Sequence, residues 1–198
     1  MNKAVFLDRD GVINELIYHT EAGIIDSPFT VDQIKLLPDV GKAINLIHDL
    51  GYLAVIVSNQ PGMAKDHFTP EVFEQMKQKL HEELKKQDAS VDAEYYCIHH
   101  PDATKKAYKK ICNCRKPKPG LIIQAAQDHT INLETSWVIG DSLTDIQAGQ
   151  AVSCHTILLG RMKCDICKRM DDLGVKPDHI APNLYKAIKI IQKQDKKD

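Results

Sequence analysis

Short apolar runs alternate along this chain with longer segments whose apolar residues recur every three or four positions. Runs of the first kind, bounded by polar residues, are typical of buried β-strands. The sequence has five of them, at 4–7, 53–57, 94–98, 137–139 and 156–159. The helical spacing occurs at 39–50, 70–87, 119–129, 146–151 and 183–191. Strands that alternate with helices predict a parallel sheet covered on both faces, that is, a Rossmann-like three-layer α/β sandwich.

Residues that start and stop helices support these assignments. Thr69 and Pro70 are the residue types preferred at the N-cap and at the first helical position. Gly51 ends the preceding helix. We expect residues 1–192 to form a single domain and residues 193–198 to be a flexible, solvated tail. Only short stretches separate the polar motifs that follow the strands, so we expect no large cap domain.

Charge and cysteine usage narrow the class of protein. The chain has 26 basic and 27 acidic residues and a net charge of −1, so we expect neither nucleic acid nor a membrane surface as a partner. No apolar run approaches the roughly 20 residues that span a bilayer. The first strand begins at once, so we expect no signal peptide and a cytoplasmic monomer. In a reducing compartment the six cysteines are metal ligands or free thiols rather than disulfides.

Asp8 and Asp10 come directly after the first predicted strand. Side chains at i and i+2 of a strand leave the same face, and ligands of open α/β sheets bind at this end of the strands. Two crowded carboxylates need a cation or a proton between them, so the pair predicts a hard cation such as Mg²⁺. The pair also offers an ionised nucleophile and a protonated acid, while Gly11 permits a tight turn beside a ligand. The alternative is a solvated acidic turn.

Three further polar segments have the chemistry of a phosphate site. A hydroxyl, an amide and turn N–H groups suit phosphate oxygens, arginine and lysine bind phosphate, and a third carboxylate completes a cation site. The segments are Ser58-Asn59-Gln60, Arg115-Lys116, and Gly140-Asp141 with Asp145. Taken singly, each has a simpler interpretation: an ordinary turn, a solvated basic loop, and a helix capped by Asp141 or Ser142.

Cys97 and His99 are followed, after twelve residues, by Cys112 and Cys114. Three thiolates and an imidazole are a standard tetrahedral set for Zn²⁺, and His100 is an alternative to His99. We expect a structural zinc site that pins the loop 97–114. It would also hold the basic pair that follows Cys114 over the active site.

A second pair, Cys164 and Cys167, has the C-x-x-C spacing. It is either incidental or half of a metal site with Cys154 or His155. We favour the incidental interpretation, because a bare pair of this spacing is common.

Together and in this order, D-x-D-G, S-N-Q, R-K-P and G-D-x-x-x-D resemble the motifs of the haloacid dehalogenase-type phosphohydrolases. The resemblance implies that Asp8 is the nucleophile that forms an aspartyl-phosphate, and that Asp10 protonates the leaving oxygen and then activates water. It implies that Ser58 and Lys116 bind the transferring phosphoryl group. Mg²⁺ would be held by Asp8, the backbone carbonyl of Asp10, and Asp141, with Asp145 beside these ligands.

The pattern C-x-H…C-x-C-R-K-P resembles the subgroup with D,D-heptose 1,7-bisphosphate 7-phosphatases and histidinol-phosphate phosphatases, and the twelve-residue gap favours the former. The resemblance implies removal of the 7-phosphate of D-glycero-D-manno-heptose 1,7-bisphosphate in nucleotide-heptose biosynthesis. Arg115 would contact this small phosphorylated sugar. Histidinol phosphate is the second candidate and a nucleic-acid 3′-phosphate the third.

Two alternatives belong to another class of protein: a phospho-signalling receiver and a non-catalytic, zinc-stabilised phospho-binding module. A receiver carries its acceptor aspartate on a middle strand, whereas this pair follows the first one. The four residues Asp8, Asp10, Lys116 and Asp141 argue against a module without catalysis.

Overall fold

Six of the described strands form a parallel sheet in the order β5-β4-β1-β6-β7-β8. The computed structural model describes residues 1–160, 170 and 173–195. The predicted pair Cys164 and Cys167 therefore lies outside the described residues. The strands are β1 (Ala4–Leu7), β4 (Leu53–Asn59), β5 (Ala93–Cys97), β6 (Trp137–Gly140), β7 (His155–Leu159) and β8 (His179–Ala181).

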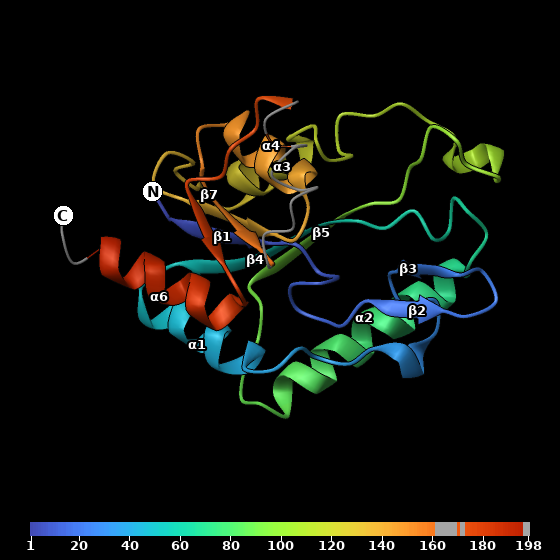
Figure 1. The fold of residues 1–198 in the computed structure, drawn as a ribbon, viewed down its shortest axis with the longest axis horizontal. Coiled ribbons are helices and arrows are strands. Elements are labelled where there is room, and N and C mark those ends of the chain that lie inside the picture. Colours follow the sequence, from blue (N-terminus) through green and yellow to red (C-terminus); the bar gives the residue numbers. More distant parts are fainter. Residues whose placement is uncertain (161–169, 171–172, 196–198) are drawn as a thin grey trace.

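Helices cover both faces of this sheet (Figure 1). One face carries α1 (Val40–Asp49), α2 (Pro70–Lys85) and α6 (Leu184–Gln194), and the other carries α3 (Gly120–Asp128) and α4 (Leu143–Gln150). Alternate residues of β1 point to the two layers, so that Val5 and Leu7 belong to the first core and Ala4 and Phe6 to the second. The predicted three-layer α/β sandwich is confirmed.

Helix starts follow the predicted local rules. Thr69 is the N-cap of α2 and its hydroxyl accepts from Val72 N at 3.3 Å, with Pro70 at the first helical position. Asn183 caps α6 in the same way, accepting from Lys186 N at 2.9 Å. No helix among the described residues is long and apolar enough to cross a membrane.

The apolar pattern predicts no strand or helix within the segment 12–37, but the structure forms both there. It contains the antiparallel hairpin of β2 (Ile17–His19) and β3 (Ile24–Asp26), followed by the short 3₁₀ helix η1 (Val31–Gln33). The strands have three residues each and lie largely at the surface, so they lack the apolar run that marks a buried strand. The edge strand β8 was missed for the same reason, since it also has three residues.

The predicted tail begins later than the sequence suggested. The last helix continues through Gln194, and the carboxylate of Asp195 accepts from Tyr52 Oη at 2.9 Å and pairs with Lys3 Nζ at 3.4 Å. Residues 193–195 are therefore attached to the domain. The rest of the predicted tail, 196–198, lies outside the described residues.

Candidate active site

Three carboxylates gather where two neighbouring strands end. Asp8 follows β1, while Asp141 and Asp145 follow β6, which pairs with β1 in parallel. One carboxylate oxygen from each residue lies within 4.8 Å of an oxygen of the other two. A Cβ atom on Gly11 would lie 2.2 Å from Asp141 Oδ2, and the φ of this glycine is 77°, so glycine is needed for this close approach. The structure thus brings two predicted cation ligands together and places Asp145 with them.

Lys116 supplies a buried positive charge to this cluster. Its Nζ lies 3.0 Å from Asp8 Oδ1 and 2.5 Å from Asp145 Oδ1, and it donates to Val57 O at 2.8 Å. Burial acts to lower the pKa of Lys116, but Asp145 and Asp8 outweigh it, so the pKa is raised. The lysine therefore stays charged between the two carboxylates.

The environment of Asp141 suits a divalent cation. Burial, followed by the nearby charges of Asp8 and Asp145, raises the pKa of Asp141 to about 7. Among the described residues, one ammonium group faces three carboxylates here, and all the donors are hard oxygen atoms. An oxygen-rich site with excess negative charge is what Mg²⁺ prefers, so the residues present fit this ion.

Asp145 has a second structural task at the start of α4. Its Oδ2 accepts from Ser142 N at 3.1 Å and from Ser142 Oγ at 2.9 Å, which closes a capping box. The helix-cap interpretation left open by the sequence therefore applies to Ser142, while Asp141 faces the carboxylate cluster. Because its two oxygens have fixed partners, Asp145 holds Lys116 firmly against the helix start.

The carboxylate of Asp10 lies in a separate polar pocket. Its Oδ1 accepts from Asn14 Nδ2 at 2.8 Å and from Arg9 Nη2 at 3.1 Å, and its Oδ2 accepts from Gln60 Nε2 at 2.5 Å. Its side chain is therefore not among the clustered cation-facing carboxylates. Sequence reasoning missed Arg9 and Asn14, because arginine is rarely fully buried and neither residue has a distinctive spacing.

The residues of the predicted phosphate-binding segment 58–60, at the end of β4, have different hydrogen-bond partners. The strand continues through Asn59, so Ser58 and Asn59 are strand residues. The simpler interpretation of these residues as an ordinary turn is therefore wrong. The Asn59 amide donates to Lys116 O at 3.1 Å and accepts from Lys116 N at 3.0 Å, so it positions the lysine. Gln60 is fully buried and donates to Ser58 Oγ at 3.1 Å.

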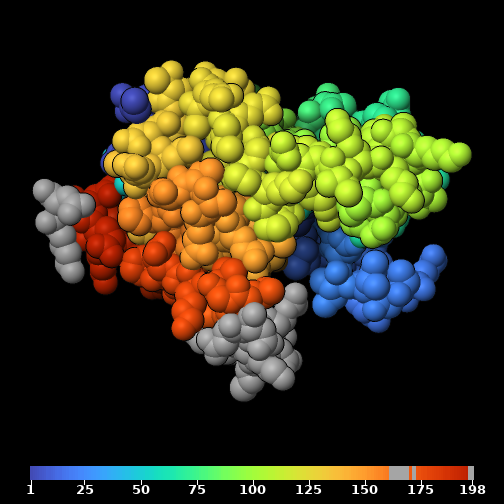
Figure 2. Space-filling model, turned by 90° about the horizontal axis from the view of Figure 1, so that it is seen from above, coloured from blue at the N-terminus to red at the C-terminus, as the bar shows by residue number. Residues whose placement is uncertain are grey.

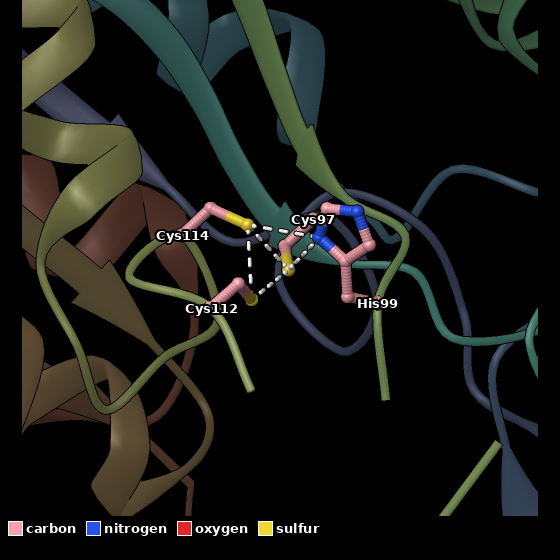
Figure 3. A group of neighbouring side chains, drawn as sticks. All are labelled: Cys97, His99, Cys112 and Cys114. Carbon is pink, nitrogen blue, oxygen red and sulfur yellow. Dashed lines mark hydrogen bonds between the residues drawn. The ribbon is translucent and has the colours of Figure 1, made fainter. Parts of the chain in front are cut away.

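The predicted zinc ligands Cys97, His99, Cys112 and Cys114 converge at the end of β5 (Figure 3). The three sulfur atoms lie 2.9–3.5 Å apart, and His99 Nδ1 lies 3.4 Å from Cys114 Sγ. His100 is not in the group, since its Nδ1 accepts from Asp102 N at 3.0 Å. Three thiols and one imidazole at these distances fit a tetrahedral Zn²⁺ site.

The cysteine cluster and the lysine of the active site are neighbours in space as well as in sequence. Cys97 pairs with Asn59 in the sheet, and the same Asn59 binds the backbone of Lys116. Arg115 lies between cluster and lysine, and its Nη1 donates to His99 O at 3.4 Å. A Cβ atom on Gly120 would lie 2.3 Å from Asn113 O, so the loop is also packed tightly against the start of α3.

The segment 12–37 and the loop 97–114 project on the same side of the molecule. In Figure 2 they are the blue hairpin and the yellow-green loop. The stretch between β4 and α2 contacts both of them: Ala64 O accepts from Thr104 N at 2.9 Å, and Lys65 lies 3.9 Å from Asp26. A cavity of about 570 Å³ borders Asp141 at the edge of this region.

A family model described as "HAD-hyrolase-like" matches residues 113–187. The chain is 35% identical over 190 residues to the D-glycero-beta-D-manno-heptose-1,7-bisphosphate 7-phosphatase of Photorhabdus laumondii, covering 96% of this chain and 97% of the relative. It is 31% identical over 193 residues to the protein of the same name from Escherichia coli K12, covering 98% and 95%.

The fold also matches solved structures. The D,D-heptose 1,7-bisphosphate phosphatase from B. bronchiseptica, crystallised with magnesium and phosphate, superposes with a TM-score of 0.77. The two sequences are 26% identical, and the match covers 97% of this chain and 99% of that one.

Proposed function

Because this chain belongs to the haloacid dehalogenase-like phosphatases that include the heptose-1,7-bisphosphate 7-phosphatases, we propose that it removes the 7-phosphate of D-glycero-D-manno-heptose 1,7-bisphosphate. The observation that supports this choice of substrate is the 35% identity to such an enzyme over 96% of the chain. The product would enter the synthesis of nucleotide-activated heptose. Since the relatives are named for the β anomer, we expect the same preference here.

The proposed nucleophile is Asp8. A carboxylate oxygen of Asp8 attacks phosphorus in line with the sugar oxygen, the P–O bond to the sugar breaks, and the leaving oxygen takes a proton from Asp10. Water then attacks the aspartyl-phosphate, gives a proton to Asp10, and the bond between Asp8 and phosphorus breaks. Splitting the hydrolysis in this way lets one carboxyl group serve as acid and then as base.

Positive charge and hydrogen-bond donors stabilise the transferring phosphoryl group in this proposal. Lys116, 3.0 Å from the nucleophile, would neutralise the equatorial oxygens together with the Ser58 hydroxyl. Arg115 would contact the sugar bisphosphate, since it follows the cysteine cluster at the same edge. Asn59 and Gln60, which the sequence also suggested as phosphate ligands, act through Lys116 and Ser58, because their amides are engaged with these residues.

We further propose that Mg²⁺ occupies the carboxylate cluster and Zn²⁺ the cysteine cluster. Asp8, Asp141 and the backbone carbonyl of Asp10 would hold Mg²⁺, which supplies charge neutralisation for the transferring phosphoryl group. Cys97, His99, Cys112 and Cys114 would hold Zn²⁺ with all four positions filled, which is typical of a structural site.

A substrate panel tests this function. Phosphate release with Mg²⁺ is measured for both anomers of heptose 1,7-bisphosphate, fructose 1,6-bisphosphate, histidinol phosphate and a 3′-phosphorylated oligonucleotide. We expect kcat/KM for the β-heptose substrate at least about tenfold above the others, or about 1.4 kcal/mol of discrimination. A higher value for histidinol phosphate would overturn the heptose substrate but not the chemistry.

A further inference from the structure

We propose that Arg9 and Gln60 form a buried positioning pair that fixes the carboxylate of Asp10 and sets the direction of the Ser58 hydroxyl. This inference rests on the proposed function, because it concerns the acid and the phosphate-binding hydroxyl of that reaction. Neither residue of the pair touches substrate in our proposal. They act through their hydrogen bonds to Asp10 and Ser58.

The burial of Arg9 indicates a task beyond packing. Its exposed fraction is 0%, and its guanidinium lies 5.9 Å from the Phe73 ring and 6.0 Å from the Tyr96 ring. A buried guanidinium is costly unless it is paired. Here its Nε and Nη2 donate to Asp10 Oδ1 at 3.2 and 3.1 Å, and Nη2 also donates to Gln60 Oε1 at 2.7 Å.

The donors of Arg9 determine the orientation of the Gln60 amide. A guanidinium has donors only, so the amide must turn its oxygen toward Arg9. Its nitrogen then faces the two other partners, Asp10 Oδ2 and Ser58 Oγ. One amide group therefore links the acid to the phosphate-binding hydroxyl.

The direction of the Ser58 hydrogen bond follows from this arrangement. Because Ser58 Oγ accepts from Gln60 Nε2 at 3.1 Å, the hydroxyl hydrogen is left to point at another acceptor. A phosphoryl oxygen of the substrate is such an acceptor. Meanwhile Asn14, which donates to Asp10 Oδ1 at 2.8 Å, completes the set of donors around that carboxylate.

Two variants separate positioning from folding. Gln60→Glu keeps the shape of the side chain and its contact with Arg9, but it replaces the donor facing Asp10 and Ser58 with an acceptor. Arg9→Lys keeps the positive charge but loses the fork that holds both partners. Gln78→Glu, the same change at an exposed position of α2, is the matched control. Melting temperature and circular dichroism report the folded fraction of each protein.

The first measurement is stopped-flow hydrolysis of p-nitrophenyl phosphate. Its leaving group departs without a proton, so phosphorylation of Asp8 needs the acid least, while hydrolysis of the aspartyl-phosphate still needs Asp10 as a base. For each variant, the steady-state rate and the rate of the first turnover are compared with those of the unmodified protein. We expect the fold decrease in the steady-state rate to be at least ten times the fold decrease in the rate of the first turnover. A purely structural defect would lower only the amount of active protein and leave this ratio unchanged.

The second measurement is the affinity for inorganic phosphate with Mg²⁺, by calorimetry. We expect Gln60→Glu to weaken phosphate binding about tenfold, because Ser58 would turn its hydrogen toward the new carboxylate. Folded variants with an unchanged rate ratio and unchanged phosphate affinity would overturn the positioning role.

The two proposals fail in different ways. An unmodified protein that neither hydrolyses p-nitrophenyl phosphate nor binds phosphate would contradict the proposed function and the positioning pair with it. An active protein whose variants behave like Gln78→Glu contradicts only the positioning pair.

Discussion

Asp8 and Lys116 form a close ion pair at the centre of the site. The ammonium lies 3.0 Å from the Asp8 carboxylate and 2.5 Å from that of Asp145, and it has almost no access to solvent. Removing the lysine charge would leave both carboxylates without their counter-ion, whereas removing the Asp8 charge leaves the lysine paired with Asp145. A substitution that removes the charge of Asp8 but preserves its size therefore tests the role of the carboxylate.

We expect Asp8→Asn to lower kcat by at least about 10³-fold while the fold is retained, because an amide oxygen cannot form the aspartyl-phosphate. Turnover of the heptose bisphosphate and circular dichroism check this together. Asp49→Asn, on the exposed end of α1, is the control for an Asp-to-Asn change. Unaltered turnover in Asp8→Asn would exclude the covalent route.

Asp141 gives a pH-dependent prediction. Its pKa is raised to about 7 without a cation, so below that pH the carboxyl is mostly protonated and a proton must leave before Mg²⁺ binds. The apparent affinity for Mg²⁺ should therefore rise with pH up to about 7 and level off above it. Calorimetric titrations with Mg²⁺ between pH 5.5 and 8.5, in the range set by this pKa, measure the effect. A flat profile would count against Asp141 as a ligand.

At the residue scale, the sequence identified polar residues that follow the strands, but it did not predict the hydrogen bonds between their side chains. Asp8 and Asp141 could be found because each follows an apolar run of a parallel sheet. Arg9 could not, since only the fold reveals that the side chain between two aspartates turns inward. The dual role of Asp145, as cap and as partner of Lys116, also depends on tertiary contacts.

At the scale of elements, the loop from β5 to α3 joins two centres. Its metal-ligand cluster ends at Cys114, and Arg115 and Lys116 follow immediately. The backbone of Lys116 is fixed on the other side by Asn59. A loss of structure in the cysteine cluster should therefore displace Lys116, because only Arg115 separates it from Cys114.

We expect Zn²⁺ chelation to lower the melting temperature by at least about 5 °C, because a bound structural ion contributes its binding energy to the folded state. Cys112→Ser should lose the ion and have the same effect, with a lower kcat as the lysine loses its support. Bound zinc and thermal melts are the measurements. Cys154→Ala is the control, since Cys154 is a buried cysteine that is not a member of the four-residue group. A protein that contains no zinc and melts identically with chelator would refute the site.

Element prediction succeeded where the signal is local and strong. The five predicted strands and the helices that connect them follow from apolar runs, spacing and caps. The hairpin of β2 and β3 has surface strands whose pairing depends on its neighbours: Phe29 stacks on His19 with ring centroids 3.7 Å apart, and His67 lies 4.0 Å from Phe29. Such contacts between distant segments have no periodic signature in the sequence.

At the scale of the whole molecule, part of the hydrophobic core lies away from the carboxylate cluster. The helix pair α1 and α6 covers one face of the sheet, whereas the carboxylates lie at the ends of β1 and β6. Ile188 of α6 is fully buried in the core of that face. It should therefore affect the free energy of unfolding without affecting catalysis.

We expect Ile188→Ala to lower the free energy of unfolding by about 2–5 kcal/mol, because it leaves a cavity in the core. The kcat of the protein that remains folded should be unchanged. Urea denaturation and turnover well below the transition measure the two quantities. Lys186→Ala, on the exposed side of the same helix, should change stability by less than about 0.5 kcal/mol. A loss of kcat in Ile188→Ala would show that this helix supports the site.

The contact between Lys3 and Asp195 brings the two ends of the described chain together. It lies at the start of β1, whereas Asp8, the proposed nucleophile, lies beyond the end of that strand. An immobilisation tag, a surface tether or a fused neighbouring enzyme could therefore be attached at either end without blocking substrate entry. The same proximity suits a circular permutant in which a short linker joins Lys3 to Asp195 and new ends open in an exposed loop.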